Sequence, residues 1–138
     1  MSRKLTLKLG ELLKNEGARR ATSFGAAFSG LRRLVISERH FQLHLIAAAC
    51  AVIMAAFLDF SSLEWAILMV AIGLVLVAEG LNSAIERAID TTTPSFHPLA
   101  KAAKDIAAAA VLIAAIISVI VGLLLYGPKL WALLTTRH

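Results

Sequence analysis

The chain has 138 residues, of which 59% are hydrophobic and 17% are charged, and its formal net charge is +5. A soluble domain of this length buries too little of its surface to hide so many apolar side chains, so the composition excludes a water-soluble enzyme. The same hydrophobicity excludes a disordered chain, and the single cysteine, Cys50, excludes a disulfide framework or a cysteine-based zinc site. We therefore expect one domain of an all-α membrane protein.

Positive charge is concentrated in residues 1–40, which contain nine Lys and Arg residues and three Glu residues. Nucleic-acid binding would need aromatic residues for base stacking, and this segment has almost none. An apolar run follows, which favours a cytoplasmic segment at a membrane surface, and that run starts too far along the chain for a signal peptide. Apolar and basic residues at helical spacing predict an amphipathic surface helix at 23–37. Leucines at similar spacing favour another within the basic segment 1–22.

Three hydrophobic segments follow, at 41–58, 65–85 and 106–126. Each approaches the roughly 20 residues that a helix needs to cross ~30 Å of hydrocarbon. We therefore predict three transmembrane helices within a membrane domain at 23–126. The remaining C-terminal tail, 127–138, is expected to be either an interfacial anchor or a frayed end.

The two links between these segments differ in charge. Residues 59–64 contain no Lys or Arg, whereas residues 87–105 contain three. Because basic loops tend to stay in the cytoplasm, the N-terminus and the second link are predicted inside, and the first link and the C-terminus outside. The Thr-Thr-Thr-Pro-Ser run at 91–95 and Pro98 are expected to interrupt the helix in the second link.

The second hydrophobic segment contains a carboxylate, Glu79, in a region where lipid makes a charge costly. Glu79 lies 14 residues after Trp65, which places it roughly 21 Å into the bilayer at ~1.5 Å per residue. Asn82 and Glu86 stand three and seven residues further on, so the three side chains share one helical face, which must point away from lipid. The pattern predicts a functional site. The alternative is that Glu79 and Asn82 only form hydrogen bonds that hold an oligomer together.

More charged residues are predicted at the cytoplasmic end of the same segments. Glu38 precedes the first segment, and Lys104 and Asp105 stand at the start of the third. Carboxylates with phosphate oxygens suit Mg²⁺, a lysine neutralises phosphate charge, and a buried Glu is a suitable base for an alcohol. The combination predicts metal-assisted phosphoryl transfer to a lipid hydroxyl. No P-loop or protein-kinase motif is present, so ATP would bind outside the common nucleotide folds.

Two longer stretches carry a specific resemblance: EGLNSAIE at 79–86 and HPLAKAAKD at 97–105. With SFGAAFSG at 23–30 and an E-x-x-F pattern at 38–41, they resemble the small integral-membrane diacylglycerol kinase and undecaprenol kinase family of bacteria, over about residues 23–122. The resemblance implies a homotrimeric helical bundle, with three transmembrane helices and a surface helix in each subunit. It further implies active sites between subunits on the cytoplasmic side of the inner membrane, a membrane lipid substrate, ATP as co-substrate and Mg²⁺ as cofactor.

The same resemblance implies a role for each candidate residue. Glu79 is expected to activate the lipid hydroxyl, and Glu38 and Glu86 to hold Mg²⁺ against the ATP phosphates. Asn82 is expected to support the site. Four more residues are expected to contact the nucleotide, with the lysine on the phosphates: Arg19, His97, Lys104 and Asp105.

Two branches of this family differ in substrate, since one phosphorylates diacylglycerol and the other undecaprenol. Residues 38–44, ERHFQLH, and residues 97–105 follow the frame of the undecaprenol branch, although His40 and Gln42 replace its usual Asn and Arg. We therefore predict undecaprenol as the substrate, with diacylglycerol as the alternative. The alternative from a different class is a non-catalytic membrane scaffold or transporter subunit.

Overall fold

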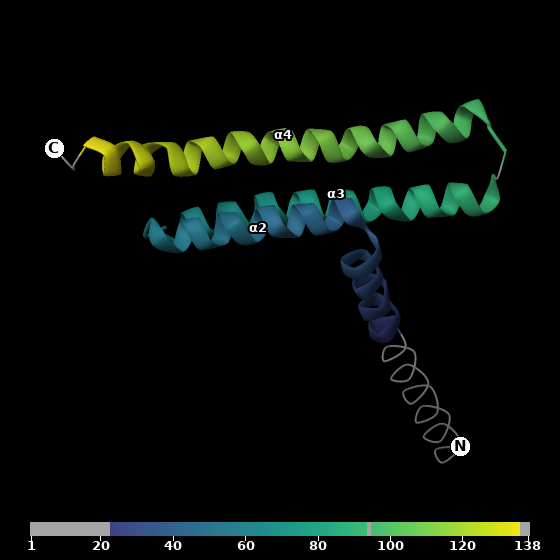
Figure 1. Ribbon diagram of the computed structural model, residues 1–138, viewed down its shortest axis with the longest axis horizontal. Helices are drawn as coiled ribbons and strands as arrows, with labels where there is room; N and C mark the ends of the chain where they lie inside the picture. The colour runs from purple at the N-terminus through teal and green to yellow at the C-terminus, as the bar shows by residue number, and fades with distance from the viewer. Residues whose placement is uncertain (1–22, 94, 136–138) are drawn as a thin grey trace, which may run out of the picture. The chain divides into compact units, whose positions relative to one another are not determined.

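The structure is a computed structural model, which describes residues 23–93 and 95–135. Three long helices make up most of it, α2 (Arg39–Phe57), α3 (Ser62–Thr92) and α4 (Pro98–Thr135), and the described residues form no strand (Figure 1). All three helices are long and apolar enough to cross a membrane, with mean hydropathies of 1.8, 2.0 and 3.0. The prediction of an all-α membrane protein with three spans is confirmed.

The chain divides into two compact units, Met1–Ser37 and Glu38–His138. In the first unit, residues 23–37 form a helix, as the spacing of apolar residues predicts. Phe24 and Phe28 lie one turn apart on this helix and expose 76% and 77% of their surface. Its position at a membrane surface stays a prediction, and the helix expected within 1–22 lies outside the described residues.

Two of the long helices exceed the hydrophobic segments that predict them. At ~1.5 Å per residue, the 31 residues of α3 span roughly 46 Å and the 38 residues of α4 roughly 57 Å, against ~30 Å of hydrocarbon. Each helix therefore continues beyond the apolar layer. Hydropathy detects only the part of a helix that suits lipid, whereas the helical backbone hydrogen bonds continue beyond that part at the ends of α3 and α4.

The ends of these helices follow from local sequence. The break predicted in the second link is confirmed, since α3 ends at Thr92 and α4 begins at Pro98. Proline suits the first turn of a helix, where its missing N–H has no intrahelical partner. Further along, α4 continues through Pro128 to Thr135, so the described part of the C-terminal tail is helical.

The turn from α2 to α3 brings all three helices together at one end of the second unit. Asp59 takes a left-handed conformation, with φ +46°, and the ring of Phe60 then packs 4.9 Å from that of Tyr126 and 6.1 Å from that of Trp65. The Tyr126 hydroxyl donates a hydrogen bond of 2.8 Å to the carbonyl oxygen of Ala51. This aromatic cluster connects α4 to both α2 and the turn.

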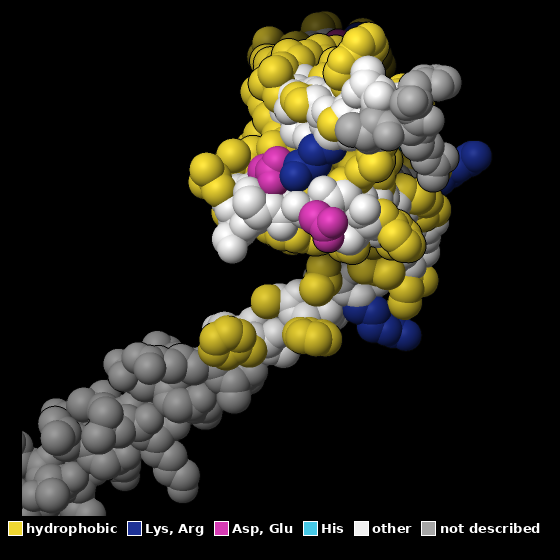
Figure 2. Space-filling view, turned by 90° about the vertical axis from the view of Figure 1, so that its left-hand side faces the viewer, with side chains coloured by type: hydrophobic (Ala, Val, Ile, Leu, Met, Phe, Trp, Pro, Cys, Tyr) yellow, Lys and Arg dark blue, Asp and Glu magenta, His cyan; other side chains and the backbone are white. Residues whose placement is uncertain are grey.

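Lys129 completes this end of the helices. Its Nζ lies 3.2 Å from a carboxylate oxygen of Glu64, 3.2 Å from the carbonyl oxygen of Asp59 and 5.1 Å from the centre of the Phe60 ring. Glu64 also forms a capping box with Ser61 at the start of α3. Figure 2 looks onto this end, where acidic and basic side chains meet among hydrophobic ones.

α3 packs against both α2 and α4, and the neighbouring helices run antiparallel (Figure 1). Ser118 of α4 donates a hydrogen bond of 3.0 Å to the carbonyl oxygen of Ala71 of α3. Buried Ala107 and Ala114 add little bulk to α4, which lets the two backbones approach. The close α3–α4 pair positions the polar residues described next.

One face of α3 is buried from Leu68 to Ser83, and the character of this face changes halfway along that stretch. The half near the turn is apolar, and the other half is polar. The buried residues, in order, are Leu68, Ala71 and Val75, then Glu79, Asn82 and Ser83. The polar half lies towards the end of the helices opposite the aromatic cluster.

Candidate active site

Glu79 is the buried carboxylate of the second unit, with only 4% of its surface exposed. Its neighbours on the same face, Asn82 and Ser83, expose 8% and 3%. A carboxylate enclosed by membrane-spanning helices is costly, which makes Glu79 a candidate functional residue. Ser83 was not among the predicted residues, although it stands four residues after Glu79 and this spacing places it on the same face.

Asn82 lies on the same face of α3 as Glu79 and bonds to a residue one turn further along the helix. Its side-chain nitrogen donates a hydrogen bond of 3.1 Å to Oε1 of Glu86, which confirms that these two residues share a face. Its side-chain oxygen is buried and has no hydrogen-bond partner within the described residues. Such an oxygen is costly to leave unpaired, while the nitrogen of the same amide holds Glu86.

Glu38 reaches the same end of α3 from α2. It is the N-cap residue of α2, but its side chain forms no cap hydrogen bond. Instead Nε and Nη2 of Arg87 both donate to its Oε1, with the Nε bond at 3.0 Å. Because Arg87 follows Glu86 directly, this ion pair brings the start of α2 to the turn of α3 that carries Glu86. Arg87 was not a predicted site residue.

The charged residues of α4 form ion pairs of their own. Lys104 lies 2.7 Å from a carboxylate oxygen of Asp90 on α3, and Lys101 lies 2.5 Å from one of Asp105. Exposed ion pairs of this kind contribute little stability. Either lysine could therefore exchange its carboxylate partner for a polyphosphate at little cost. The sequence prediction named Lys104 and Asp105 but not their partners Asp90 and Lys101.

Of the two remaining predicted residues, the structure describes only His97. His97 is exposed and directly precedes α4, where its carbonyl oxygen accepts a hydrogen bond of 3.0 Å from the Lys101 amide. Arg19 lies outside the described residues. No contact among the described residues brings His97 to Glu79.

The oxygen donors near Glu86 are of the chemical type that a magnesium ion prefers. The residues that the structure describes contain no group of three or more His, Cys, Asp and Glu side chains arranged to hold a metal. Mg²⁺ does not require such a group, because it is usually held by one or two carboxylates together with substrate phosphates and water. Glu86, oriented by Asn82, and Glu38, oriented by Arg87, supply carboxylate oxygens of this kind.

The arrangement has the parts needed for phosphoryl transfer at a membrane surface. A buried carboxylate adjoins oxygen donors for a metal, and lysine and arginine side chains lie at the same end of the helices in exposed ion pairs. Such a site can remove a proton from an alcohol and stabilise the charge of a polyphosphate.

Comparison with known proteins agrees with this chemistry. The sequence model described as "Prokaryotic diacylglycerol kinase" matches residues 25–126. Undecaprenol kinase of Bacillus subtilis is 48% identical over 118 residues, which cover 85% of this chain and 95% of that protein. Diacylglycerol kinase of Escherichia coli K12 is 40% identical over 96 residues, covering 70% of this chain and 79% of that protein. The chain therefore belongs to the prokaryotic diacylglycerol kinase family.

Proposed function

We propose that this membrane-embedded lipid kinase transfers the γ-phosphate of ATP to the hydroxyl of undecaprenol. The observation that carries the proposal is the buried Glu79 carboxylate, beside the Asn82–Glu86 pair, at the end of the helices that also holds the exposed cations. Undecaprenol is favoured over diacylglycerol because the similarity to the B. subtilis undecaprenol kinase is 48% over nearly its whole length. The diacylglycerol kinases of Synechocystis and E. coli are 39% and 40% identical.

Glu79 acts as the general base in this proposal. Its carboxylate accepts the proton of the lipid hydroxyl as the hydroxyl oxygen attacks the γ-phosphorus, and ADP leaves with the electrons of the broken P–O bond. Burial between helices keeps water from Glu79, so that ATP is not hydrolysed in place of the lipid reaction.

Glu86 and Glu38 are proposed as the carboxylates that hold Mg²⁺. When bound, Mg²⁺ supplies neutralisation of charge on the ATP phosphates. Asn82 fixes the orientation of Glu86 by its hydrogen bond, and Arg87 fixes that of Glu38 from the neighbouring helix. Both carboxylates are therefore positioned before the nucleotide arrives, which lowers the cost of binding it.

Lys104 is proposed to exchange its partner when ATP binds. Its ammonium group leaves the Asp90 carboxylate for the phosphates, where a point charge with three donors is effective. Asp105, His97 and Arg19 are proposed as the other nucleotide contacts.

The assembly and orientation are part of the same proposal. We infer a homotrimer with active sites between subunits, which accords with the large apolar side chains exposed on all three long helices. The nine Lys and Arg residues of segment 1–40 favour a cytoplasmic N-terminus and active site in the bacterial inner membrane.

The proposal is tested by incubating the purified protein in mixed micelles with Mg²⁺ and labelled ATP, offering undecaprenol and diacylglycerol in parallel. Label in undecaprenyl phosphate is the expected result. Label in phosphatidic acid alone would make the protein a diacylglycerol kinase. Label in neither lipid, with the protein folded, would favour a non-catalytic scaffold or transporter subunit.

A further inference from the structure

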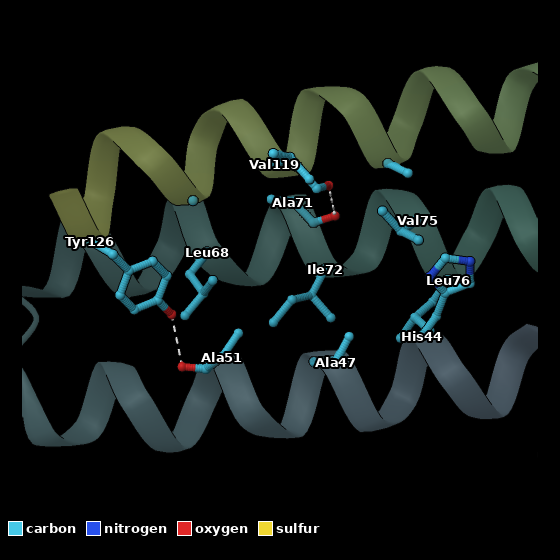
Figure 3. A pocket seen from close by; sticks show the side chains of 14 residues that line it. His44, Ala47, Ala51, Leu68, Ala71, Ile72, Val75, Leu76, Val119 and Tyr126 are labelled. Carbon is cyan, nitrogen blue, oxygen red and sulfur yellow. Dashed lines mark hydrogen bonds between the residues drawn. The ribbon is translucent and has the colours of Figure 1, made fainter.

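The three long helices line a partly open cavity of about 410 Å³, called here the membrane groove (Figure 3). Its walls are almost wholly apolar and come from every long helix, including Ala48 and Ala51 of α2, Val75 of α3 and Gly122 of α4. The volume lies within the range of small-molecule sites, and such sites are typically apolar with a few polar groups. Because small side chains line it, the space is built into the packing of the helices.

The membrane groove contains a few polar groups, and they differ in whether they already form hydrogen bonds. The hydroxyls of Ser118 and Tyr126 are already used, since they donate to the carbonyl oxygens of Ala71 and Ala51. The imidazole of His44 lies at the opposite end from Tyr126, beside Leu76 (Figure 3). Within the described part of the chain it forms no side-chain hydrogen bond, so it can still bind a polar group of a ligand.

The end of the membrane groove that holds His44 is the end nearest Glu79. Val75 lines the groove and belongs to the buried face of α3, and the next residue of that face is Glu79, one turn or ~6 Å further along the helix. In the other direction the groove follows α3 from Val75 to Leu68, roughly 10 Å, and ends at Tyr126. A molecule in the groove therefore has one end at the general base and the other at the aromatic cluster.

The shape of the groove favours a single thin chain as its occupant. The hydrogen bond from Tyr126 of α4 to Ala51 of α2 crosses the groove at its far end. A helix of a second copy, about 10 Å wide with its side chains, would need a channel that continues along the whole length of α3. A single hydrocarbon chain fits the groove, because it can end at Tyr126. The lipid around membrane-spanning helices supplies such chains.

We propose that the membrane groove binds the chain of the lipid alcohol next to its reacting hydroxyl, and that it selects a single polyisoprenoid chain over the paired chains of a diacylglycerol. This inference rests on the proposed function. Next to its hydroxyl a polyprenol continues as one chain, whereas a glycerol backbone branches into two, and the groove offers one path away from Glu79. His44 at the mouth of the groove forms a hydrogen bond with the alcohol oxygen.

Two substitutions that fill the membrane groove test the proposal. Ala48→Leu narrows it from α2, and Gly122→Leu from α4, where an added Cβ meets no atom within 4 Å. Ala49→Leu is the matched control, since Ala49 is the exposed neighbour of Ala48 and does not line the groove. We expect both filled variants to raise KM for undecaprenol about tenfold, with kcat and KM for ATP little changed, and the control to match the wild type.

The possible outcomes separate this inference from the proposed function. If the wild type phosphorylates undecaprenol and both filled variants behave like Ala49→Leu, the groove is not the chain site, while the proposed function stands. If instead both filled variants lose the oligomer and Ala49→Leu keeps it, the occupant is a second copy, and the inference is wrong.

If the wild type makes no undecaprenyl phosphate, the proposed function fails, and a binding experiment decides the inference alone. The probe is farnesol carrying a photoreactive group, crosslinked to the wild type in micelles and located by peptide mapping. Label within residues 44–51 or 115–126, reduced in Ala48→Leu and Gly122→Leu, supports a polyisoprenoid site in the groove. Label confined to other segments overturns it.

Discussion

At the scale of single residues, Glu79 is an ionisable side chain in a buried position. Burial makes a charge costly, so a glutamate at such a position indicates a chemical role. The residue exposes 4% of its surface on a helix with mean hydropathy 2.0. Glu64 of the same helix lies at the other end, where it is bound by Lys129 and its capping box. Glu64 therefore belongs to the packing at the turn, whereas Glu79 is the candidate catalytic residue.

Glu79→Gln is expected to lower kcat by at least about 100-fold, because an amide cannot accept the hydroxyl proton. The two side chains have nearly the same shape, so the variant should assemble as the wild type does. Labelled-phosphate transfer measures the rate, and circular dichroism with gel filtration checks the fold. Glu64→Gln is the control and should keep its turnover. Near wild-type turnover in Glu79→Gln would contradict the role of this residue as base.

Asn82 offers a test of how the metal carboxylate is held. Asn82→Ala removes the hydrogen bond to Glu86, which leaves that carboxylate free to rotate away from the position that Mg²⁺ needs. Loss of such an orienting partner typically weakens metal affinity about 10- to 100-fold, so the Mg²⁺ concentration for half-maximal activity should rise by that factor.

A magnesium titration of the transfer rate measures this effect. Ser83→Ala is the control, because Ser83 is equally buried on the same face and the structure shows no hydrogen bond between it and Glu86. If Asn82→Ala lowers the maximal rate and leaves the half-saturating Mg²⁺ concentration unchanged, Asn82 does not position a metal carboxylate.

At the scale of helices, the aromatic cluster and the active site occupy opposite ends, so stability and catalysis can be altered separately. Tyr126→Phe keeps the ring against Phe60 and removes the hydrogen bond to Ala51. We expect the free energy of unfolding in detergent to fall by about 1 kcal/mol, because the hydroxyl is one buried hydrogen bond. The measurement is the unfolding transition, and kcat for lipid phosphorylation should remain that of the wild type. An unchanged unfolding transition would show that the bond contributes nothing to helix packing.

The helices themselves were largely predictable, and their lengths were not. Hydropathy located the three spans, and Pro98 located the break before α4. The extensions of α3 to Thr92 and of α4 to Thr135 were not predicted. Hydropathy identifies only the residues that prefer lipid, whereas the helical backbone hydrogen bonds continue beyond those residues.

The site divides in the same way between what spacing determines and what packing determines. Glu79, Asn82 and Glu86 lie on one helix, so their shared face follows from 3.6 residues per turn. The partners Arg87 and Asp90 depend on the register between helices, which no local pattern specifies. The membrane groove escaped prediction for the same reason, since three helices contribute to it.

At the scale of the whole molecule, the proposed trimer with active sites between subunits has a consequence that a single chain does not. If Glu79 and Lys104 of one site come from different subunits, two inactive variants can restore activity in a mixed trimer. Glu79→Gln lacks the base and Lys104→Met lacks the phosphate contact, so each alone should be nearly inactive. In a mixed trimer, a site is intact where its Glu79 comes from the Lys104→Met chain and its Lys104 from the Glu79→Gln chain.

Random assembly of equal amounts of the two variants makes about a quarter of the sites intact, since each of two neighbouring positions is filled correctly half the time in a cyclic trimer. We therefore expect co-expressed variants to show about a quarter of the wild-type rate. Variants mixed after separate purification, without exchange of subunits, serve as the control and should stay inactive. Lys104 also forms an ion pair with Asp90 of its own chain. The competing arrangement is therefore an active site formed within a single subunit. Co-expressed variants that remain as inactive as either alone would establish that arrangement, because a site complete in one chain gains nothing from a neighbour that carries the other substitution.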